Sequence, residues 1–165
     1  MSIKILKELA LQENRRKYPN FPEHARPQPK YSDKNSNGLT KCIIDFLNFS
    51  GCQAERISIQ GRFVDNRQTY TDVVGFRRQI GSTKWIKGQM TAGTADISST
   101  IAGKSVKIEV KVGKDRMREA QWKYKQQVER AGGIYIIAKT FDQFYQDITT
   151  LFPELKNPES ATNSG

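Results

Sequence analysis

The sequence predicts an α/β protein, in which helices pack against a central sheet. Two neighbouring runs, residues 96–100 and 105–112, alternate as strands do, and an amphipathic helix follows over residues 115–131. Residues 134–138 form a continuous apolar run with the length of a strand buried on both faces. Strands and helices that interleave in this way are typical of a layered α/β core.

The N-terminal part of the chain predicts two helices with a connection between them. Residues 2–17 have aliphatic side chains at helical spacing and a basic end. Residues 18–37 contain four prolines, and we expect a linker or extended arm there rather than a packed element. A second helix is expected from about residue 39 to 50, where Gly51 is a natural stop.

Residues 54–63 alternate apolar and polar side chains, which predicts one strand. Residues 66–88 favour short strands or a hairpin, with turns at Gly75 and at Gly81-Ser82. Basic residues there are interleaved with Tyr70, Phe76 and Trp85, which suits a surface that contacts a DNA backbone. A plain basic loop is the alternative.

The helix over residues 115–131 has Asp115 as its expected N-cap and Gly132-Gly133 at its end. Gln121 falls within the apolar stripe of this helix, so we expect it to face inward. Its amide then makes either a structural hydrogen bond or a contact with the charged strand before it. A last amphipathic helix is expected between Phe141 and Phe152, and residues 154–165 are expected to form a flexible tail.

Composition narrows the classes of function. The formal charge of +10 favours a polyanionic partner, of which nucleic acid is the commonest. Two cysteines are too few for a disulfide framework, and neither a membrane span nor a signal peptide is visible, so an intracellular, cytoplasmic setting is the default. The segment Gly103-Lys104-Ser105 lacks the earlier glycine of a phosphate-binding loop, and we reject ATP binding.

Asp96, Glu109 and Lys111 are the candidate catalytic residues. Glu109 and Lys111 lie two positions apart, so their side chains project from the same face of a strand. A strand whose charged face meets water is the alternative. If the two strands pair, the carboxylates of Asp96 and Glu109 can converge, and with the carbonyl of Val110 they suit Mg²⁺ or Mn²⁺. A lysine beside such a metal can orient water or neutralise a phosphorane-like transition state.

The pattern Gly93-Thr94-Ala95-Asp96-Ile97, then Ile108-Glu109-Val110-Lys111, then Gln121 and Gly132-Gly133-Ile134-Tyr135 resembles the PD-(D/E)XK nuclease superfamily. Within it, the chain is most similar to the VRR-NUC branch, the virus-type replication-repair nucleases of phages and prophages. The resemblance covers about residues 39–148.

The resemblance implies a restriction-endonuclease-like core, a central mixed sheet flanked by helices in α-β-β-β-α-β order. It divides the chain into an N-terminal helix and arm (1–37), a nuclease-like domain (38–153) and a tail (154–165). It also implies an enzyme that cleaves DNA with Mg²⁺ or Mn²⁺ and leaves 5′-phosphate ends. Asp96 and Glu109 would be metal ligands, Lys111 the catalytic lysine and Gln121 the supporting residue.

Some relatives of this kind act as homodimers on branched DNA, and a phage-encoded chain would work in the host cytoplasm. The N-terminal helix could also dock on a second subunit and help to build a dimer. We expect the DNA to be contacted by a set of basic side chains, namely Arg62, Arg77, Arg78, Lys84, Lys87, Lys114, Arg116 and Arg118.

The chain departs from the family near Asn37 and Lys41, where relatives often have an acidic residue and Asp45 lies further along the helix. Residues 66–87 also look like an insertion. These two features favour an alternative, a non-catalytic nucleic-acid-binding protein on the same fold.

Overall fold

A computed structural model describes residues 2–57, 61–86, 88 and 91–156 of the 165-residue chain. Its internal contacts divide the chain into two compact units. The first unit combines Met1–Ile57 with Ala92–Gly165, and the second is Ser58–Thr91. The helices and the larger sheet all belong to the first unit, so the predicted α/β class is confirmed there.

The sheet of the first unit is mixed, with strand order β1-β6-β7-β8. Its strands are β1 (Gln53–Arg56), β6 (Ile97–Ile101), β7 (Lys104–Val110) and β8 (Ile134–Ala138). β6 runs antiparallel to β1 and β7, whereas β7 and β8 are parallel. Ala102 and Gly103 join β6 to β7 with φ of 47° and 76°, as a two-residue hairpin turn requires.

Apolar side chains fill one side of this sheet. Three helices cover that side: α1 (Ser2–Lys17), α2 (Ser36–Phe49) and α4 (Phe141–Leu151). Ile108 and Val110 of β7 reach into this core, as their alternation with Glu109 predicts. Phe46 of α2 lies against Phe141 and Phe144 of α4, with ring centroids 5.9 and 6.4 Å away. The sheet is therefore anchored from one side.

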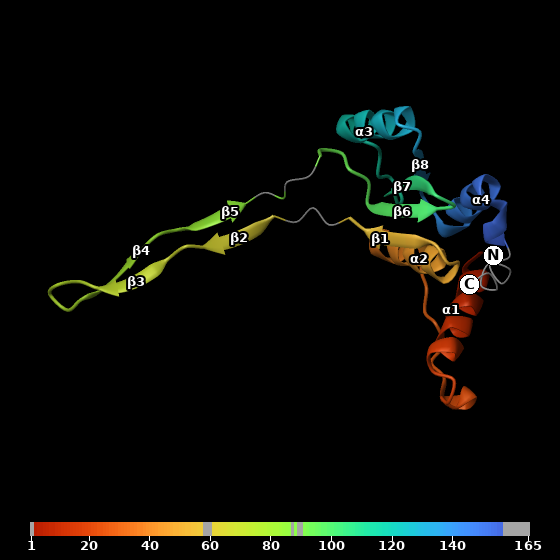
Figure 1. The fold of residues 1–165 in the computed structure, drawn as a ribbon, viewed down its shortest axis with the longest axis horizontal. Helices are drawn as coiled ribbons and strands as arrows, with labels where there is room; N and C mark the ends of the chain where they lie inside the picture. The colour runs from red at the N-terminus through yellow and green to blue at the C-terminus, as the bar shows by residue number, and fades with distance from the viewer. Residues whose placement is uncertain (1, 58–60, 87, 89–90, 157–165) are drawn as a thin grey trace. The chain divides into compact units, whose positions relative to one another are not determined.

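The other side of the sheet carries polar side chains and is covered by α3 (Glu119–Arg130) (Figure 1). No residue of α3 is fully buried, and its Tyr124 ring packs edge-on against Tyr135 of β8. α3 adds little to the apolar core. The side chains beneath it can therefore be polar, because they do not have to fill a core.

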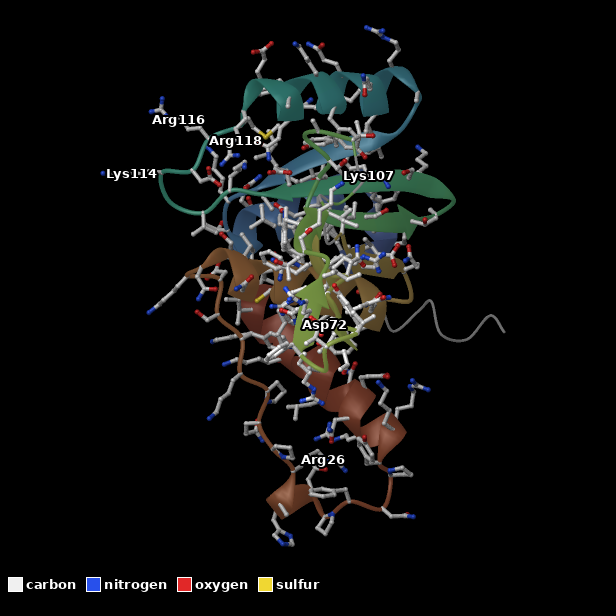
Figure 2. The ribbon with its side chains drawn as sticks, turned by 90° about the vertical axis from the view of Figure 1, so that its left-hand side faces the viewer. Arg26, Asp72, Lys107, Lys114, Arg116 and Arg118 are labelled. Atoms are coloured by element: carbon white, nitrogen blue, oxygen red, sulfur yellow. The ribbon has the colours of Figure 1, made fainter. Side chains whose placement is uncertain are left out.

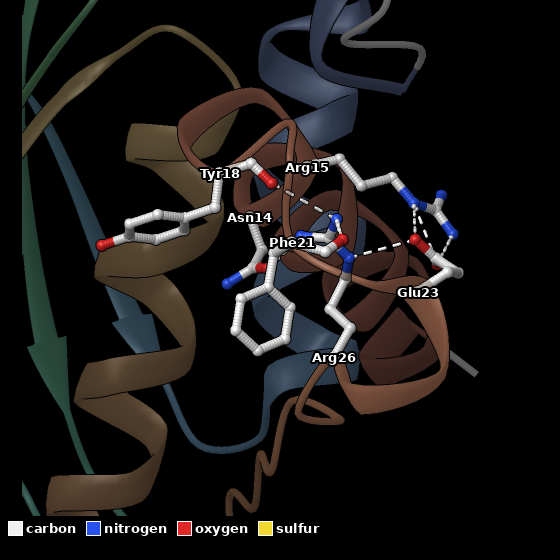
Figure 3. Close-up of polar contacts among 6 residues, drawn as sticks. All are labelled: Asn14, Arg15, Tyr18, Phe21, Glu23 and Arg26. Carbon is white, nitrogen blue, oxygen red and sulfur yellow. Dashed lines mark hydrogen bonds and ion pairs between the residues drawn. The ribbon is translucent and has the colours of Figure 1, made fainter.

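The connection over residues 18–37 is mostly exposed and irregular, as expected of a linker or extended arm, but it is held to the first unit at a buried arginine. A short helix, η1 (Glu23–Ala25), brings Arg26 back against the end of α1. Arg26 is only 6% exposed and donates hydrogen bonds to Asn14 Oδ1 (2.6 Å) and to the carbonyl oxygen of Phe21 (2.9 Å) (Figure 3). Proline content predicted irregular backbone correctly, but it carries no signal for a buried arginine.

α1 also packs within its own unit. Leu6 and Leu9 are buried in the core with α2 and α4, and the Ser2 amide donates to Asp142 of α4 (2.8 Å). The apolar face that we considered for docking on a second subunit is thus covered inside the chain.

Three element boundaries differ from expectation. α2 begins at Ser36, because Asn35 caps it by accepting the Gly38 amide (2.8 Å). α3 begins only at Glu119, so Asp115 is not its N-cap. Part of the expected tail forms a short helix, η2 (Pro153–Lys156), whose Leu155 is buried, while residues 157–165 lie outside the described part of the chain.

The second unit is a two-stranded ribbon. β2 (Arg62–Asp65) pairs with β5 (Thr83–Ile86), and β3 (Gln68–Thr71) pairs with β4 (Arg77–Ile80), both antiparallel (Figure 1). The expected single strand over residues 54–63 is wrong, because β1 and β2 belong to different sheets; Ser58–Gln60 are outside the described residues. The alternation of apolar and polar residues could not show with which strand each half of this segment would pair.

The turn at Gly75 is confirmed, with φ of 91° and a hydrogen bond from the Gly75 amide to the Asp72 carbonyl (3.0 Å). Gly81 does not reverse the chain. Its φ is 95°, and a Cβ there would stand 2.2 Å from the carbonyl oxygen of Asn66 on the facing strand. Glycine is needed at Gly81 for close approach of two strands rather than for a turn.

Among the helices that the structure describes, none combines the length and the apolarity that crossing a membrane requires.

Candidate active site

Asp96 and Glu109 face each other across the β6–β7 pair. The register pairs Ile97 with Ile108, which sets Asp96 opposite Glu109 one step further along. The Val110 amide donates to Asp96 Oδ2 (2.9 Å), and the Ile57 amide donates to the Asp96 carbonyl (2.8 Å). The expected pairing of the two strands is confirmed, and Asp96 is fixed by backbone groups on both sides.

Glu109 is a buried carboxylate, 1% exposed, with three polar neighbours. Lys111 Nζ lies 2.8 Å from Glu109 Oε1, and Gln121 Nε2 donates to the same oxygen. The Tyr135 hydroxyl lies 3.5 Å from Oε2. Groups from β7, α3 and β8 thus hold one carboxylate in place.

Lys111 is buried as well, 6% exposed, just beyond the end of β7. Its amide donates to the Ala138 carbonyl (2.8 Å), which keeps the backbone alongside β8. Besides Glu109, its ammonium group reaches Asp115 Oδ2 at 3.3 Å. Asp115, which was expected to cap α3, therefore serves as a second anion for this lysine.

Gln121 faces inward as predicted, and its amide makes both of the contacts that stood as alternatives, one with the charged strand and one structural hydrogen bond. While its amide nitrogen donates to Glu109, its Oε1 accepts the Arg118 backbone amide (2.9 Å). That second bond satisfies an amide at the start of α3, where no intrahelical acceptor exists. One side chain thus begins the helix and ties it to the buried carboxylate.

Burial and neighbouring charges shift the pKa values of Glu109, Lys111 and Tyr135. Burial raises the pKa of Glu109, Lys111 partly offsets that rise, and the nearby Asp96 carboxylate raises it further. Burial lowers the pKa of Lys111, but Glu109 and Asp115 outweigh it, so the net pKa is above the ordinary value. Burial also raises the pKa of Tyr135, with the charges of Glu109 and Asp96 adding to it. Lys111 is accordingly a cation at neutral pH and Tyr135 a neutral donor.

The carboxylates of Asp96 and Glu109 and the Val110 carbonyl offer oxygen ligands, which suit a hard divalent cation, although the set is small. No cluster of three or more His, Cys, Asp or Glu side chains able to hold a metal occurs in the described ranges. The carboxylates of Asp96 and Glu109 are favourable ligands for Mg²⁺ or Mn²⁺, with the Val110 carbonyl and water completing a shell of oxygens. Asp45 is not a third ligand here, because its Oδ2 accepts from Tyr31 (2.9 Å) and from Lys41.

A pocket of about 380 Å³ lies beside Lys111. Trp122, Met117 and Ile137 give it apolar surface. Its charged lining comes from Lys111, Asp115, Arg116 and Lys139. Such a combination of flat apolar surface and cations suits a nucleotide, whose base is apolar on its faces and whose phosphate is anionic.

The predicted DNA contacts fall into two groups. Lys114, Arg116 and Arg118 are exposed in the segment between β7 and α3, next to this pocket (Figure 2). Arg62, Arg77, Arg78 and Lys84 are exposed on the ribbon of the second unit, and Lys87 lies outside the described residues.

Sequence reasoning missed Asp115 and Tyr135 as neighbours of the charged pair. Tyr135 had a signal in its favour, because it interrupts an aliphatic run in β8 with a hydroxyl that needs a partner when buried. Asp115 had none, since its capping role was an equally good explanation of its position.

A scan against protein-family models finds no family that matches the chain, and a search among curated proteins finds no match either.

Proposed function

We propose that this chain is a Mg²⁺- or Mn²⁺-dependent DNA endonuclease of the PD-(D/E)XK kind, similar to the VRR-NUC branch. One observation carries the proposal: Asp96 lies opposite a buried Glu109 that is paired with Lys111 and held by Gln121. A buried ion pair of this kind costs desolvation energy and is a weak stabiliser, so its presence near the carboxyl end of β7 favours a functional role.

The order of elements supports the same fold. With the ribbon set aside, the chain runs α2-β1-β6-β7-α3-β8, the α-β-β-β-α-β succession of the restriction-endonuclease-like core. The ribbon stands between β1 and β6 as an insertion would.

Asp96, Glu109 and the Val110 carbonyl would hold the cation. When bound, the cation supplies Lewis acidity, which polarises the phosphate and lowers the pKa of a coordinated water. In the reaction, water adds to phosphorus, the bond to the 3′ oxygen breaks, and that oxygen takes up a proton, leaving a 5′-phosphate. Lys111, charged in the free protein, neutralises the additional negative charge as water adds.

The supporting side chains position these groups. Gln121 and the neutral Tyr135 hydroxyl fix the Glu109 carboxylate, so that the ligand does not have to reorganise when a cation enters. Asp115 holds the Lys111 ammonium toward the pocket. Lys114, Arg116 and Arg118 supply positive charge along the approach, which favours the DNA backbone as the substrate.

The test is cleavage of labelled linear, flapped and four-way DNA in Mg²⁺ or Mn²⁺. We expect Asp96→Ala and Lys111→Ala to lose about 100-fold or more in rate, because the first removes a ligand of the cation and the second removes positive charge beside the reacting phosphate. Lys107→Ala is the matched control: Lys107 projects from the same face of β7, but its ammonium group binds Ser98 (2.6 Å). Equal cleavage by all three variants would remove the site assignment. Preference for the four-way substrate, together with a dimeric mass, would support the expected homodimer on branched DNA.

A second function, nucleic-acid binding without cleavage, is favoured by one feature. Among the described residues, only Asp96 and Glu109 face each other at the expected metal position, because Asp115 pairs with Lys111 and Asp45 has other partners. Titration with Mn²⁺ separates the two functions: the nuclease binds Mn²⁺ and loses it in Glu109→Ala, whereas the binding protein shows salt-sensitive DNA affinity that ignores the metal.

A further inference from the structure

The ribbon over residues 62–86 exposes an unusual amount of apolar surface. Eight of the twelve large apolar side chains that stand exposed among the described residues lie on it. Phe63 and Val74 are each 74% exposed, and Phe76 is 64% exposed. An isolated two-stranded hairpin is at best marginally stable in water, and clustered exposed apolar groups mark interaction sites. The ribbon therefore has the features of a surface that works against a partner.

Its charge indicates the kind of partner. Residues 58–91 contain six basic side chains and two acidic ones, Asp65 and Asp72. Both acids have arginine partners on the ribbon itself, Asp65 with Arg67 (2.6 Å) and Asp72 with Arg78 (2.5 Å). Arg62, Arg77 and Lys84 have no carboxylate partner in the described ranges. The charge left for a ligand is positive.

The register sorts these side chains onto two faces. In the β2–β5 pair, Arg62 lies beside Ile86 and Val64 beside Lys84, while Phe63 and Trp85 pack edge to face on the other side with centroids 4.6 Å apart. In the β3–β4 pair, Gln68 lies beside Ile80 and Tyr70 beside Arg78, while the alternate pairs are polar or basic.

The same register continues through the two residues per strand that separate the pairs, where the Asn66 amide donates to the Ser82 carbonyl (3.2 Å). Alternation therefore carries on from one pair to the next. We call the side with Arg62, Tyr70, Arg78, Ile80, Lys84 and Ile86 the basic–apolar face. Phe63, Thr69, Arg77, Gln79 and Trp85 lie on the opposite face.

We propose that the basic–apolar face of the ribbon docks in the major groove of a DNA duplex. The major groove admits a two-stranded β-ribbon, and its walls are phosphates while its floor presents base edges and thymine methyl groups. On this face a cation lies beside an apolar side chain in three of the cross-strand pairs, Arg62 with Ile86, Lys84 with Val64 and Arg78 with Tyr70, so both kinds of contact are available to a groove of this composition. A second copy of the ribbon is a poorer occupant, because facing it would bring Arg62 and Lys84 of two chains together.

The inference rests on the proposed function for the choice of DNA, but not on cleavage. Binding is therefore measured on the full chain in EDTA, by fluorescence anisotropy with a labelled duplex. We expect Tyr70→Ala/Ile80→Ala to weaken binding about tenfold, the value of one or two good contacts. Thr69→Ala/Gln79→Ala is the matched control: it changes two residues of the same strands on the opposite face, and we expect its affinity to stay within about twofold of the wild type.

Charge gives a second, independent measurement. Arg62→Gln/Lys84→Gln should reduce the slope of log affinity against log salt by about two, since each phosphate contact contributes about 0.9. The Thr69→Ala/Gln79→Ala control, on the opposite face, should leave the slope unchanged. Circular dichroism shows whether each variant retains the wild-type fold.

Three results would overturn the proposal: equal weakening by both alanine pairs, tighter binding of single-stranded than of duplex DNA, or a dimer that the Tyr70→Ala/Ile80→Ala change abolishes while DNA affinity stays. Failure of the nuclease function has a different signature. Binding would then follow the basic–apolar face while no DNA is cut with any metal.

Discussion

Folding removes water from the Glu109 carboxylate, and contacts with Lys111, Gln121 and Tyr135 take the place of that hydration. Such an exchange is favourable only while every partner stays in place, because a buried charge without its counter-ion costs several kcal/mol. The pair is therefore sensitive to the loss of one member and tolerant of the loss of both.

Lys111→Met should destabilise the folded protein by about 3–5 kcal/mol at pH 7, because it leaves Glu109 buried without a cation. The loss should be smaller at pH 5. The pKa of Glu109 is already raised by burial, and without Lys111 it rises further, so the folded state favours the protonated acid. A carboxyl whose folded pKa exceeds its unfolded pKa contributes stability below the unfolded value, and that contribution falls as pH rises. Urea denaturation at both pH values measures the difference.

The control is Glu109→Gln/Lys111→Met, which removes both charges. It should recover most of the lost stability and show a flatter pH dependence than Lys111→Met. Equal stability of the single variant at pH 5 and pH 7 would contradict the account of the pair.

At the scale of single residues, the sequence was informative where the period of a strand or helix fixes the direction of a side chain. Spacing by two placed Glu109 and Lys111 on one face, and helical spacing turned Gln121 inward. Asp115 and Tyr135 were missed because their contacts depend on how separate elements meet, which no local pattern records.

Among the elements, the start of α3 is fitted closely to the segment that leads into β6. Gly93 has φ of 83°, and a Cβ there would stand 2.2 Å from the carbonyl oxygen of Ala120. Only glycine allows this approach, and Asp96 follows three residues later. The glycine at the head of the motif thus has a steric reason that is separate from catalysis.

Gly93→Ala should destabilise the protein by about 2 kcal/mol more than Gly103→Ala, as overpacking adds to backbone strain. Gly103 is a matched control, because its φ of 76° is nearly the same but no atom lies within 4 Å of the position of its Cβ. Thermal or urea denaturation of the two variants gives the comparison. Equal losses would show that α3 shifts at little cost.

Most element types could be predicted, whereas several boundaries could not. β7 and α4 follow strong periodic patterns, β8 is a continuous apolar run, and all three lie close to their predicted ranges. α3 starts late because Gln121 satisfies the Arg118 amide, so a competing cap displaced the one at Asp115. The strand expected over residues 54–63 divides because the two halves pair with different partners.

In the whole molecule, the two compact units each carry one of the two tryptophans. Trp122 lines the pocket beside Lys111, and Trp85 packs on Phe63 on the opposite face of the ribbon. They are equally exposed in the free protein, at 47% and 49%. A difference in their response to DNA therefore reports where the DNA lies rather than how accessible each ring was beforehand.

With duplex DNA in EDTA, Trp85→Phe, which leaves Trp122, should show strong quenching of tryptophan emission, because stacked bases quench indole. Trp122→Phe, which leaves Trp85, should change little, because its ring faces away from the docked surface. Strong quenching of Trp85 and none of Trp122 would reverse the assignment of both DNA-contacting surfaces.

At this scale, the resemblance led us to expect an insertion at residues 66–87; the structure has a separate compact unit at Ser58–Thr91, whose form the sequence did not indicate. Turn residues at Gly75 and Gly81 fitted a hairpin or a loop equally well. The burial of Arg26 was also hidden, because it depends on acceptors contributed by Asn14 of α1 and by the Phe21 carbonyl of the connection itself.

The ribbon connects β1 to β6, where a long connection costs little conformational entropy. β1 and β6 are antiparallel neighbours, so their ends lie close together whatever joins them, and two residues would suffice for a hairpin. Lengthening a connection whose ends already meet costs little, since the entropy of closure grows only with the logarithm of length. Descendants of such a chain could exchange, shorten or lose the ribbon without disturbing the sheet that carries Glu109. Under the proposed function, substrate preference in the ribbon and chemistry at the sheet could then change independently in evolution.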